Sequence, residues 1–336
     1  MRTKIRDKVH GALLGVAVGD ALGAPLEFMT VAEIIDKHGG PVRDMIGGGW
    51  LNIAPGEITD DTQMTLAVAE GIVENPRNPT PGIGQRFIEW HDSNPKDIGN
   101  CCKAAILSAK MAGARSYEQW YAVAQLVDEM TGGQTAGNGA LMRTVYPAIY
   151  YDYVTDAAEA SCRISDMTHY SRHSRQAVKD YACAIAAAIL YENDAESKRW
   201  ANHFIERIEC FLNGRPAEPT GYCIDTIVCA HNSIMDTESF EDAVISAVNL
   251  GGDADTIGAV TGGLAGAIYG AAAIPTRWIA ALDSSIVAQI SRLTDAAMKA
   301  NTRPLFLNKD LEGDISIWQK LSEKIRNTLK RSTAIF

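Results

Sequence analysis

Several features that mark common functional classes are scarce or absent in this 336-residue sequence. The seven cysteines are odd in number and scattered, and no two of them form a Cys-x-x-Cys pair, which disfavours a disulfide scaffold and a zinc site. The net charge of −10 argues against nucleic acid as the main partner. Residues 1–7 lack the apolar core of a signal peptide. Together these absences predict a cytoplasmic protein with reduced thiols.

Motifs of several enzyme classes are also missing. There is no Gly-x-Ser-x-Gly sequence, so a hydrolase with a serine nucleophile elbow has no support. The glycine-rich segment 133–143 contains no Lys-Ser or Lys-Thr pair and is not a Walker loop. His169 and His173 have the spacing of two ligands on one helical face, but no His-Glu-x-x-His sequence surrounds them. His169 is instead expected to contact a ligand or to cap a helix.

Helical periodicity dominates the chain, and no alternation of apolar and polar residues persists long enough to predict a sheet. The expected helices are 5–22, 62–74, 83–91, 103–112, 117–130, 140–150, 157–163, 174–191, 198–211, 224–235, 240–248, 256–273 and 284–300. No proline- or glycine-rich segment is long enough to be an interdomain linker. We therefore predict one compact all-α domain over residues 1–300. Residues 301–336 carry an amphipathic stripe and are expected to form a helical tail packed on the domain or extending it.

Two expected helices carry glycine at every fourth position, namely Gly11, Gly15, Gly19 and Gly23 in one and Gly258, Gly262, Gly266 and Gly270 in the other. Each interior glycine costs about 1 kcal/mol relative to alanine, so we expect helices that approach each other closely. The uncharged stretch 256–274 has the glycine spacing of a membrane helix. Because it begins on aspartates, which are costly near lipid, a buried helix is predicted and not a membrane span.

Two acidic clusters, far apart in the sequence, each lie at the expected start of a helix. They are Thr59-Asp60-Asp61-Thr62 and Gly251-Gly252-Asp253-Ala254-Asp255-Thr256. Helix capping alone explains aspartates in such positions. A cation site is the alternative, because four converging carboxylates, with Glu27 as a fifth, would repel each other unless a cation neutralised them. Without cysteine or histidine beside them, such oxygen ligands favour magnesium or manganese over zinc.

The segment 133–143 is glycine-rich and leads into an expected helix. Free backbone N–H groups in such a segment could receive a phosphate group. A plain connecting loop is the alternative, and the residue pattern does not decide between the two.

Taken in order, these segments resemble the ADP-ribosylglycohydrolase family. The matching stretches are 11–28, 59–62, 137–143, 168–169 and 251–256. Within the family the likeness is greatest to the dinitrogenase reductase-activating glycohydrolases. That closer likeness rests on Glu27-Phe-Met-Thr, Gly47-Gly-Gly-Trp50, Ile58-Thr-Asp-Asp and Gly99-Asn100-Cys101.

The resemblance implies an all-α fold around a central site for two divalent cations, Mg²⁺ or Mn²⁺. Positions that match family metal ligands are Thr59, Asp60, Asp61, Asp253, Asp255 and Thr256. Glu27 and Asp60 are the candidate catalytic carboxylates. Positions that match contacts to ADP-ribose are Asn100, Gly137, Asn138, Gly139, His169 and Tyr222. The implied reaction is hydrolysis of the N-glycosidic bond between ADP-ribose and an arginine side chain of a modified protein, which releases ADP-ribose.

The chain departs from the family pattern in two internal places, and its tail from about residue 301 has no counterpart in that pattern. Gln134-Thr135 stands where the nearest relatives have acidic residues, and the segment after His169 is more basic than theirs. An alternative function is that of an immunity or regulatory binding protein on the same fold, which blocks an ADP-ribosylating partner with or without hydrolase activity. The complete set of acids favours the hydrolase, because a protein that only blocks a partner need not keep it.

Overall fold

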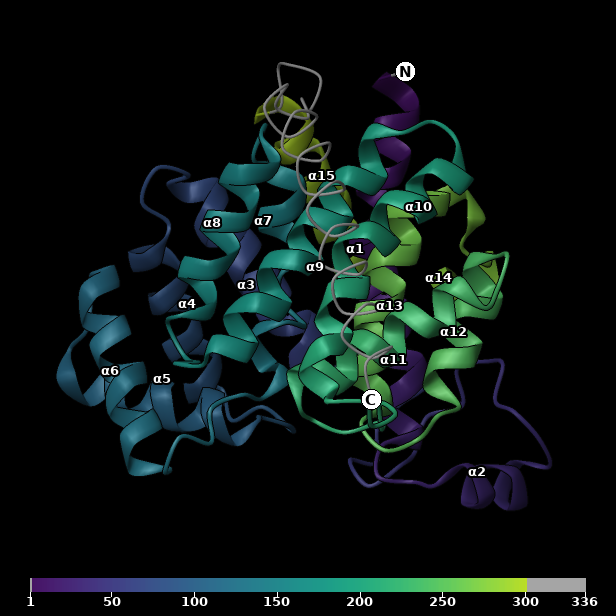
Figure 1. The fold of residues 1–336 in the computed structure, drawn as a ribbon, viewed down its shortest axis with the longest axis horizontal. Helices are drawn as coiled ribbons and strands as arrows, with labels where there is room; N and C mark the ends of the chain where they lie inside the picture. Colours follow the sequence, from purple (N-terminus) through teal and green to yellow (C-terminus); the bar gives the residue numbers. More distant parts are fainter. Residues whose placement is uncertain (1, 301–336) are drawn as a thin grey trace, which may run out of the picture.

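The structure is a computed structural model that describes residues 2–300, so the predicted tail at 301–336 lies outside the described residues. Within residues 2–300 there is no β-strand, and the two isolated bridges there pair Gly48 with Ile53 and Gly137 with Tyr222. The remaining regular structure in this range is helical (Figure 1). The predicted all-α fold is therefore confirmed.

The α-helices are α1 (Arg2–Gly23), α2 (Val31–His38), α3 (Asp60–Glu74), α4 (Thr80–Asp92), α5 (Asn100–Ala112), α6 (Tyr117–Met130), α7 (Val145–Tyr150), α8 (Val154–Ser165), α9 (Arg172–Leu190), α10 (Asp194–Ile205), α11 (Cys223–Met235), α12 (Phe240–Val248), α13 (Ala254–Tyr269), α14 (Thr276–Ala281) and α15 (Ser284–Ala300). Short 3-10 helices are η1 (Ala24–Leu26), η2 (Asn138–Ala140), η3 (Glu206–Leu212) and η4 (Ala271–Ala273).

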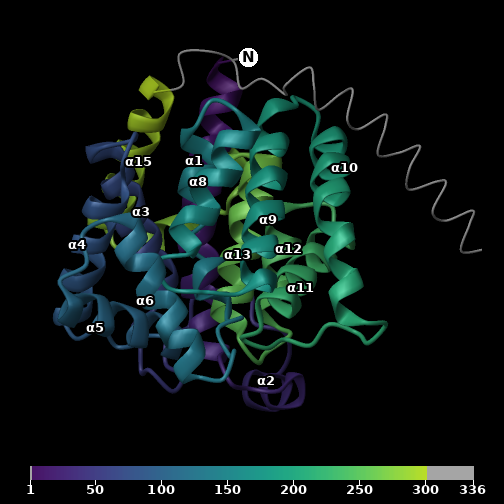
Figure 2. The same cartoon turned by 60° about the vertical axis from the view of Figure 1, so that its left-hand side comes forward.

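Helices α1 and α13 lie side by side at the centre of the fold, and the other helices surround them (Figures 1 and 2). Gly15 faces Gly262, and Gly19 faces Gly258, so the two helices run antiparallel. A Cβ atom added at Gly15 would overlap the carbonyl oxygen of Gly262. Only glycine allows this approach of two backbones. The close contact predicted from the glycine spacing is confirmed.

Segment Arg2–Leu26 is long and apolar enough to cross a membrane by length and composition, and 94% of its most apolar window is buried inside the fold. Burial of this kind is usual for a helix at the centre of a globular core. Helix α13, the other candidate, is buried along nearly its whole length. Its expected burial is therefore confirmed.

The expected helices differ from the observed ones where local signals interrupt the periodicity. Helix α2 was not predicted, although Thr30 and Glu33 form a capping box at its start. Helix α14 was also missed, because it is a single short element after Pro275. The expected helix 256–273 ends at Tyr269, since Gly270 adopts a positive φ of 84°. The expected helix 140–150 begins only at Val145, after η2 and a turn, and the expected helix 198–211 passes into η3 at Glu206.

The antiparallel central pair places the end of α1 and the start of α13 at the same end of the molecule. This end lies opposite the labelled N-terminus, in the region where α2 is drawn (Figure 1). The start of α3 reaches the same place, because Thr59 and Thr62 donate hydrogen bonds to Asp20 of α1. Loops that connect the surrounding helices complete this end, and they carry most of the remaining candidate residues.

Candidate active site

The first acidic cluster is held by Asp20, a buried residue near the end of α1. Its carboxylate accepts hydrogen bonds from the backbone N–H of Thr59 at 3.0 Å and from that of Thr62 at 3.1 Å. It also accepts from both hydroxyl groups, Thr59 Oγ1 at 2.8 Å and Thr62 Oγ1 at 2.5 Å. Thr59 is the N-cap of α3 but makes no capping bond with its own side chain. Asp20 therefore caps α3 from another helix and fixes where the acids of α3 begin.

The second acidic cluster meets the first at the start of α13. Gly251 and Gly252 both have a positive φ and form the turn that precedes the helix. Asp61 Oδ2 accepts hydrogen bonds from Thr256 Oγ1 at 3.3 Å and from Thr59 Oγ1 at 3.4 Å. Side chains from the two clusters are thus in direct contact, although Asp61 and Thr256 are 195 residues apart.

A pocket of about 500 Å³ opens beside these clusters. Glu27, Asp97 and Asp255 each direct a carboxylate oxygen to one point of it, and the three oxygens lie within 4.8 Å of one another. Its volume is in the usual range for small-molecule sites. The pocket therefore combines space for an organic ligand with a concentrated set of acids.

Most residues that the sequence singles out line this pocket. They are Glu27, Asp60, Asn100, Gly137, Asn138, Gly139, His169, Asp253, Asp255 and Thr256. Thr59 and Asp61 are buried and do not line it. The structure also leaves Tyr222 outside the lining, although its backbone pairs with Gly137.

Burial dominates the electrostatics of these acids. Removal from water raises the pKa of Glu27 to about 8, and the charges of Asp97, Asp253 and Asp60 add to the rise against a hydrogen bond from Trp50. Burial likewise raises the pKa of Asp60 to about 8, again with neighbouring carboxylates contributing. In the same way burial raises the pKa of Asp61, Asp97, Asp253 and Asp255. Without a positive charge among them, these groups would tend to hold protons.

The donor set fits divalent cations. Asp61 Oδ1 is buried and has no hydrogen-bond partner among the described residues. A buried carboxylate oxygen with no partner is costly unless it is protonated or bound to a cation. The acids supply only oxygen ligands, and no histidine or cysteine belongs to the three-carboxylate group at Glu27. Such a set suits Mg²⁺ or Mn²⁺ better than Zn²⁺.

The glycine-rich loop lines the pocket and contacts the acids. Asn138 donates its backbone N–H to the carbonyl of Gly221 at 3.0 Å, so this amide is already paired. Its side-chain Nδ2 donates to Thr226 Oγ1 at 2.9 Å and also to Asp253 Oδ2. Asn138 therefore ties the glycine loop to the acidic cluster. The loop leads only into the 3-10 turn η2 and not directly into an α-helix as expected.

His169 is fully buried against the glycine loop. Burial, with a further effect of the Arg143 charge, lowers its pKa to about 3, so the ring is neutral. Arg143 donates to Thr168 Oγ1 at 2.5 Å, and that hydroxyl lies 2.7 Å from His169 Nδ1. Donation by the Thr168 hydroxyl to Nδ1 leaves the proton on Nε2, the ring nitrogen nearest Gly137. Since α9 begins at Arg172, His169 and His173 do not share a helical face.

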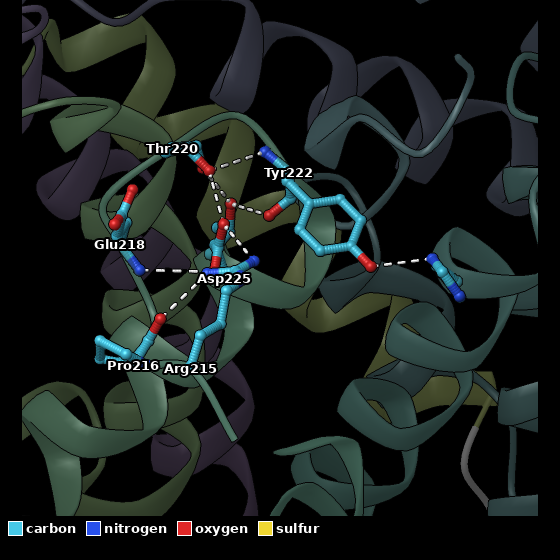
Figure 3. Close-up of polar contacts among 8 residues, drawn as sticks. Arg215, Pro216, Glu218, Thr220, Tyr222 and Asp225 are labelled. Atoms are coloured by element: carbon cyan, nitrogen blue, oxygen red, sulfur yellow. Dashed lines mark hydrogen bonds and ion pairs between the residues drawn. The ribbon is translucent and has the colours of Figure 1, made fainter. Parts of the chain in front are cut away.

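Tyr222 belongs to a loop, residues 213–222, that Asp225 holds in place (Figure 3). Asp225, in the first turn of α11, accepts two hydrogen bonds from Arg215 at 2.8 and 3.1 Å. It also accepts from Thr220 Oγ1 at 2.8 Å. The Tyr222 hydroxyl points away from this cluster and lies 2.8 Å from His173 Nδ1. The same loop lines the pocket with Pro219, Thr220 and Gly221.

Three residues in or beside the site were not predicted from the sequence to act there, although Trp50 is part of a stretch that carries the family likeness. Asp97 lies in the loop between α4 and α5, where no periodicity or motif marks it. Trp50 donates its indole N–H to Glu27 Oε2 at 2.5 Å, and only the Gly47-Gly48-Gly49 run before it hinted at a special turn. Asp225 follows Tyr222 closely in sequence, and a first-turn aspartate is an ordinary helix feature. The roles of Asp97 and Trp50 depend on contacts with Glu27, which lies in another segment, whereas Asp225 contacts residues of the loop just before its own helix.

Comparisons of the sequence and of the structure with known proteins agree on one family. The family model described as ADP-ribosylglycohydrolase matches residues 1–305. The ADP-ribosyl-[dinitrogen reductase] glycohydrolase of Rhodospirillum rubrum is 33% identical over 303 residues, which cover 88% of this chain and 96% of that protein. The ADP-ribosylarginine hydrolase Tri1 of Serratia proteamaculans is 32% identical, and the match covers 81% of this chain and 74% of that protein.

A solved structure described as an ADP-ribosylglycohydrolase-related protein complex superposes with a TM-score of 0.74 at 30% identity. The match covers 89% of this chain and 100% of that one. The buried acids at the starts of α3 and α13 lie within the matched region of the family model. The chain belongs to the ADP-ribosylglycohydrolase family.

Proposed function

We propose that this protein hydrolyses the N-glycosidic bond between ADP-ribose and an arginine side chain of a modified protein, with two divalent cations, Mg²⁺ or Mn²⁺, at the acidic site. The family and the named relatives support ADP-ribosyl hydrolysis in general. Arginine linkage is supported by the name of one relative, the ADP-ribosylarginine hydrolase Tri1. The observation that carries the proposal is the pocket into which Glu27, Asp97 and Asp255 direct their carboxylates.

The cations would be held by the two acidic clusters. The proposed ligands are Thr59, Asp60, Asp61, Asp253, Asp255 and Thr256. Bound there, divalent ions would polarise the ribose hydroxyls and lower the pKa of a water molecule. The unpaired Oδ1 of Asp61 and the upward pKa shifts of the surrounding acids support this assignment.

The side chains of the chain itself would orient the substrate and move the proton. Glu27 lines the pocket and is fixed by the Trp50 indole, so it can exchange a proton with a water molecule at the anomeric carbon. Asp60 is the second candidate for that role. With the Thr168 hydroxyl donating to Nδ1, the neutral His169 ring would carry its proton on Nε2 and could donate a hydrogen bond to the ligand. Asn100 and the loop of Gly137, Asn138 and Gly139 also line the pocket and would contact ADP-ribose.

Tyr222 is the weakest member of the proposed substrate-binding set. It does not line the pocket in this structure, and its hydroxyl is paired with His173. A contact between Tyr222 and ADP-ribose would require the ring to turn from His173 toward the pocket.

The cysteines of the chain are all free thiols, which supports the proposal that the reaction takes place in the cytoplasm. This localisation is independent of the chemistry, and fractionation of cells that express the tagged protein tests it.

The experiment that tests the function measures release of free ADP-ribose from a peptide carrying one ADP-ribosylated arginine. We expect turnover in the presence of Mg²⁺ or Mn²⁺ and loss of turnover after chelation. Glu27→Gln and Asp60→Asn should each lower kcat by about 100-fold or more, as expected for an acid or base in the reaction. Tight binding of the substrate without release of ADP-ribose would favour the alternative of a binding protein that blocks an ADP-ribosylating partner.

A further inference from the structure

Two large aromatic side chains stand exposed at the mouth of the pocket. Phe28 is 68% exposed and Trp50 is 53% exposed, and their ring centroids lie 5.3 Å apart. Burial of two adjacent aromatic rings would contribute a large favourable free energy, which is absent while the rings are exposed to water. Exposed apolar patches commonly mark interaction sites. This pair therefore needs an explanation beyond the stability of the fold.

The backbone of this chain holds Phe28 in its outward position. Phe28 has a φ of 63°, which is rare for a bulky residue. Its N–H donates to the carbonyl of Gly252 at 2.6 Å, and Gly252 donates back to the carbonyl of Met29 at 2.8 Å. The strained conformation is thus fixed by the turn that precedes Asp253. Strained residues that the surrounding structure fixes in this way are concentrated at functional sites.

Trp50 is held by two contacts, one with Glu27 and one with Phe28. Its indole N–H donates to Glu27 Oε2 at 2.5 Å, while the ring contacts Phe28. The polar edge of the indole therefore faces the pocket, and about half of the residue stays exposed. The aromatic pair is directly connected to the candidate catalytic carboxylate.

A second depression, of about 460 Å³, lies on the outer side of this pair. We call it the outer depression; it is adjacent to the pocket, because Glu27, Phe28 and Trp50 line both. Its far side is formed by α2, which contributes Glu33, Asp36 and Lys37. Two acids against one lysine make that side acidic, so it would attract a basic segment.

We infer that the outer depression and its aromatic pair bind the polypeptide of the substrate, namely the residues that flank the ADP-ribosylated arginine. This inference rests on the proposed function. A modified side chain that reaches the pocket brings its own backbone against the pocket mouth, and the mouth on this side is aromatic and acidic. The favoured flanking residues are apolar next to the modified arginine and basic slightly farther away.

The test compares two substrates of different size. One is ADP-ribosyl-arginine as the free amino acid conjugate, and the other is a peptide with one ADP-ribosylated arginine flanked by leucine and lysine. Asp36→Lys changes a residue of the outer depression that does not line the pocket. It should raise KM for the peptide by about tenfold, the usual loss for one important interface residue, and leave kinetics on the free conjugate unchanged.

Phe28→Asn provides the second variant, since asparagine tolerates the left-handed backbone that Phe28 adopts. Its kcat/KM should fall by about tenfold more on the peptide than on the free conjugate. Met111→Ser is the matched control, because Met111 is 81% exposed near the end of α5 and lines neither depression. This control should leave kcat/KM unchanged on both substrates.

The outcomes separate the two proposals. If the parent turns over both substrates, and Asp36→Lys and Phe28→Asn change the kinetics on both equally or not at all, the docking surface is overturned. The proposed function is then intact. Absence of turnover of either substrate by the parent protein overturns the proposed function and the docking surface with it. If Phe28→Asn melts well below the parent protein, Asp36→Lys on the helix surface decides the matter.

Discussion

At the scale of single residues, the site depends on carboxylates placed where water is excluded. Asp61 and Asp255 are both almost fully buried, and burial raises the pKa of each well above the usual range. An aspartate that only caps a helix does not have to be buried, because a capping residue stabilises a helix on an exposed surface as well. The cost of burying these charges is offset if cations bind between them. The burial of Asp61 and Asp255 therefore favours a cation site over simple helix capping.

Substitution of Asp255 tests this reading. Asp255→Asn keeps the shape of the side chain but removes one ligand charge, so most activity should be lost. Binding that is restricted to the folded state stabilises it, and Mn²⁺ at about 100 times its Kd should raise the Tm of the parent by about 5 °C. The rise should be much smaller for Asp255→Asn. Differential scanning fluorimetry with and without Mn²⁺ measures both.

The matched control is Asp295→Asn, which removes an exposed acid paired with Arg6 on the surface. It should keep the full Mn²⁺ response of the parent. An equal rise in Tm with Mn²⁺ in Asp255→Asn and in the parent would mean that Asp255 only stabilises the first turn of α13.

At the scale of elements, the helix pair α1 and α13 positions both acidic clusters. The glycine contacts fix the distance between these helices, and the end of α1 supplies Asp20, which caps α3. A change in the spacing of the pair would therefore move Asp20 relative to Asp255. Stability and site geometry are coupled through these glycines.

Gly262→Ala should destabilise the fold. The added Cβ would overlap the carbonyl oxygen of Gly15, and neither backbone can move away without disturbing its helix. Overpacking of this kind costs about 1–3 kcal/mol or more, and the Tm should fall by several degrees. Gly99→Ala is the control, because Gly99 has a negative φ and open space where its Cβ would lie. A parent-like Tm for Gly262→Ala would show that the helix pair is loosely packed.

A second element-scale prediction concerns the loop 213–222. Asp225→Asn removes the charge that holds Arg215 and weakens the acceptor for Thr220, so the loop should lose its fixed position. Because Pro219 accepts the backbone N–H of Asp253 at 3.0 Å, the loop supports the acidic cluster as well. Affinity for ADP-ribose, measured by calorimetry, should fall by about tenfold.

Asp295→Asn again serves as the control, since it weakens an exposed ion pair outside the pocket. Unchanged ADP-ribose affinity in Asp225→Asn would assign the Arg215 ion pair to stability alone.

At the scale of the whole molecule, the net charge of −10 opposes the approach of an anionic ligand. ADP-ribose carries a pyrophosphate, so local donors such as those near His169 and the glycine loop must attract it. An arginine-linked substrate adds a cationic guanidinium beyond the ribose, and the acids of the site would attract that group. The overall charge therefore favours a substrate with a positive group on the side of the scissile bond.

We predict a clear preference for arginine-linked over serine-linked ADP-ribose on peptides that are otherwise identical. Serine linkage offers no positive charge, and its alkoxide is a poorer leaving group unless it is protonated. Rates of ADP-ribose release from the two peptides under the same Mg²⁺ conditions measure the preference. Comparable rates would overturn the arginine assignment and leave the glycohydrolase assignment unchanged.

The sequence by itself determined the fold class, the close packing of two glycine-lined helices and the identity of most acids at the site. These conclusions follow from local patterns, because helical periodicity, glycine spacing and acids at helix starts are visible within one segment. Tertiary structure alone decided that Asp97 and Trp50 line the pocket, that Asp225 holds the loop beside it, and that the Tyr222 hydroxyl pairs with His173. Asp97 and Trp50 lie in loops whose partners are distant in sequence, and a loop without periodicity carries no local signal of its partners. Asp225 lies in a helix and its partners are near in sequence, but an aspartate in the first turn of a helix is too ordinary to mark this role.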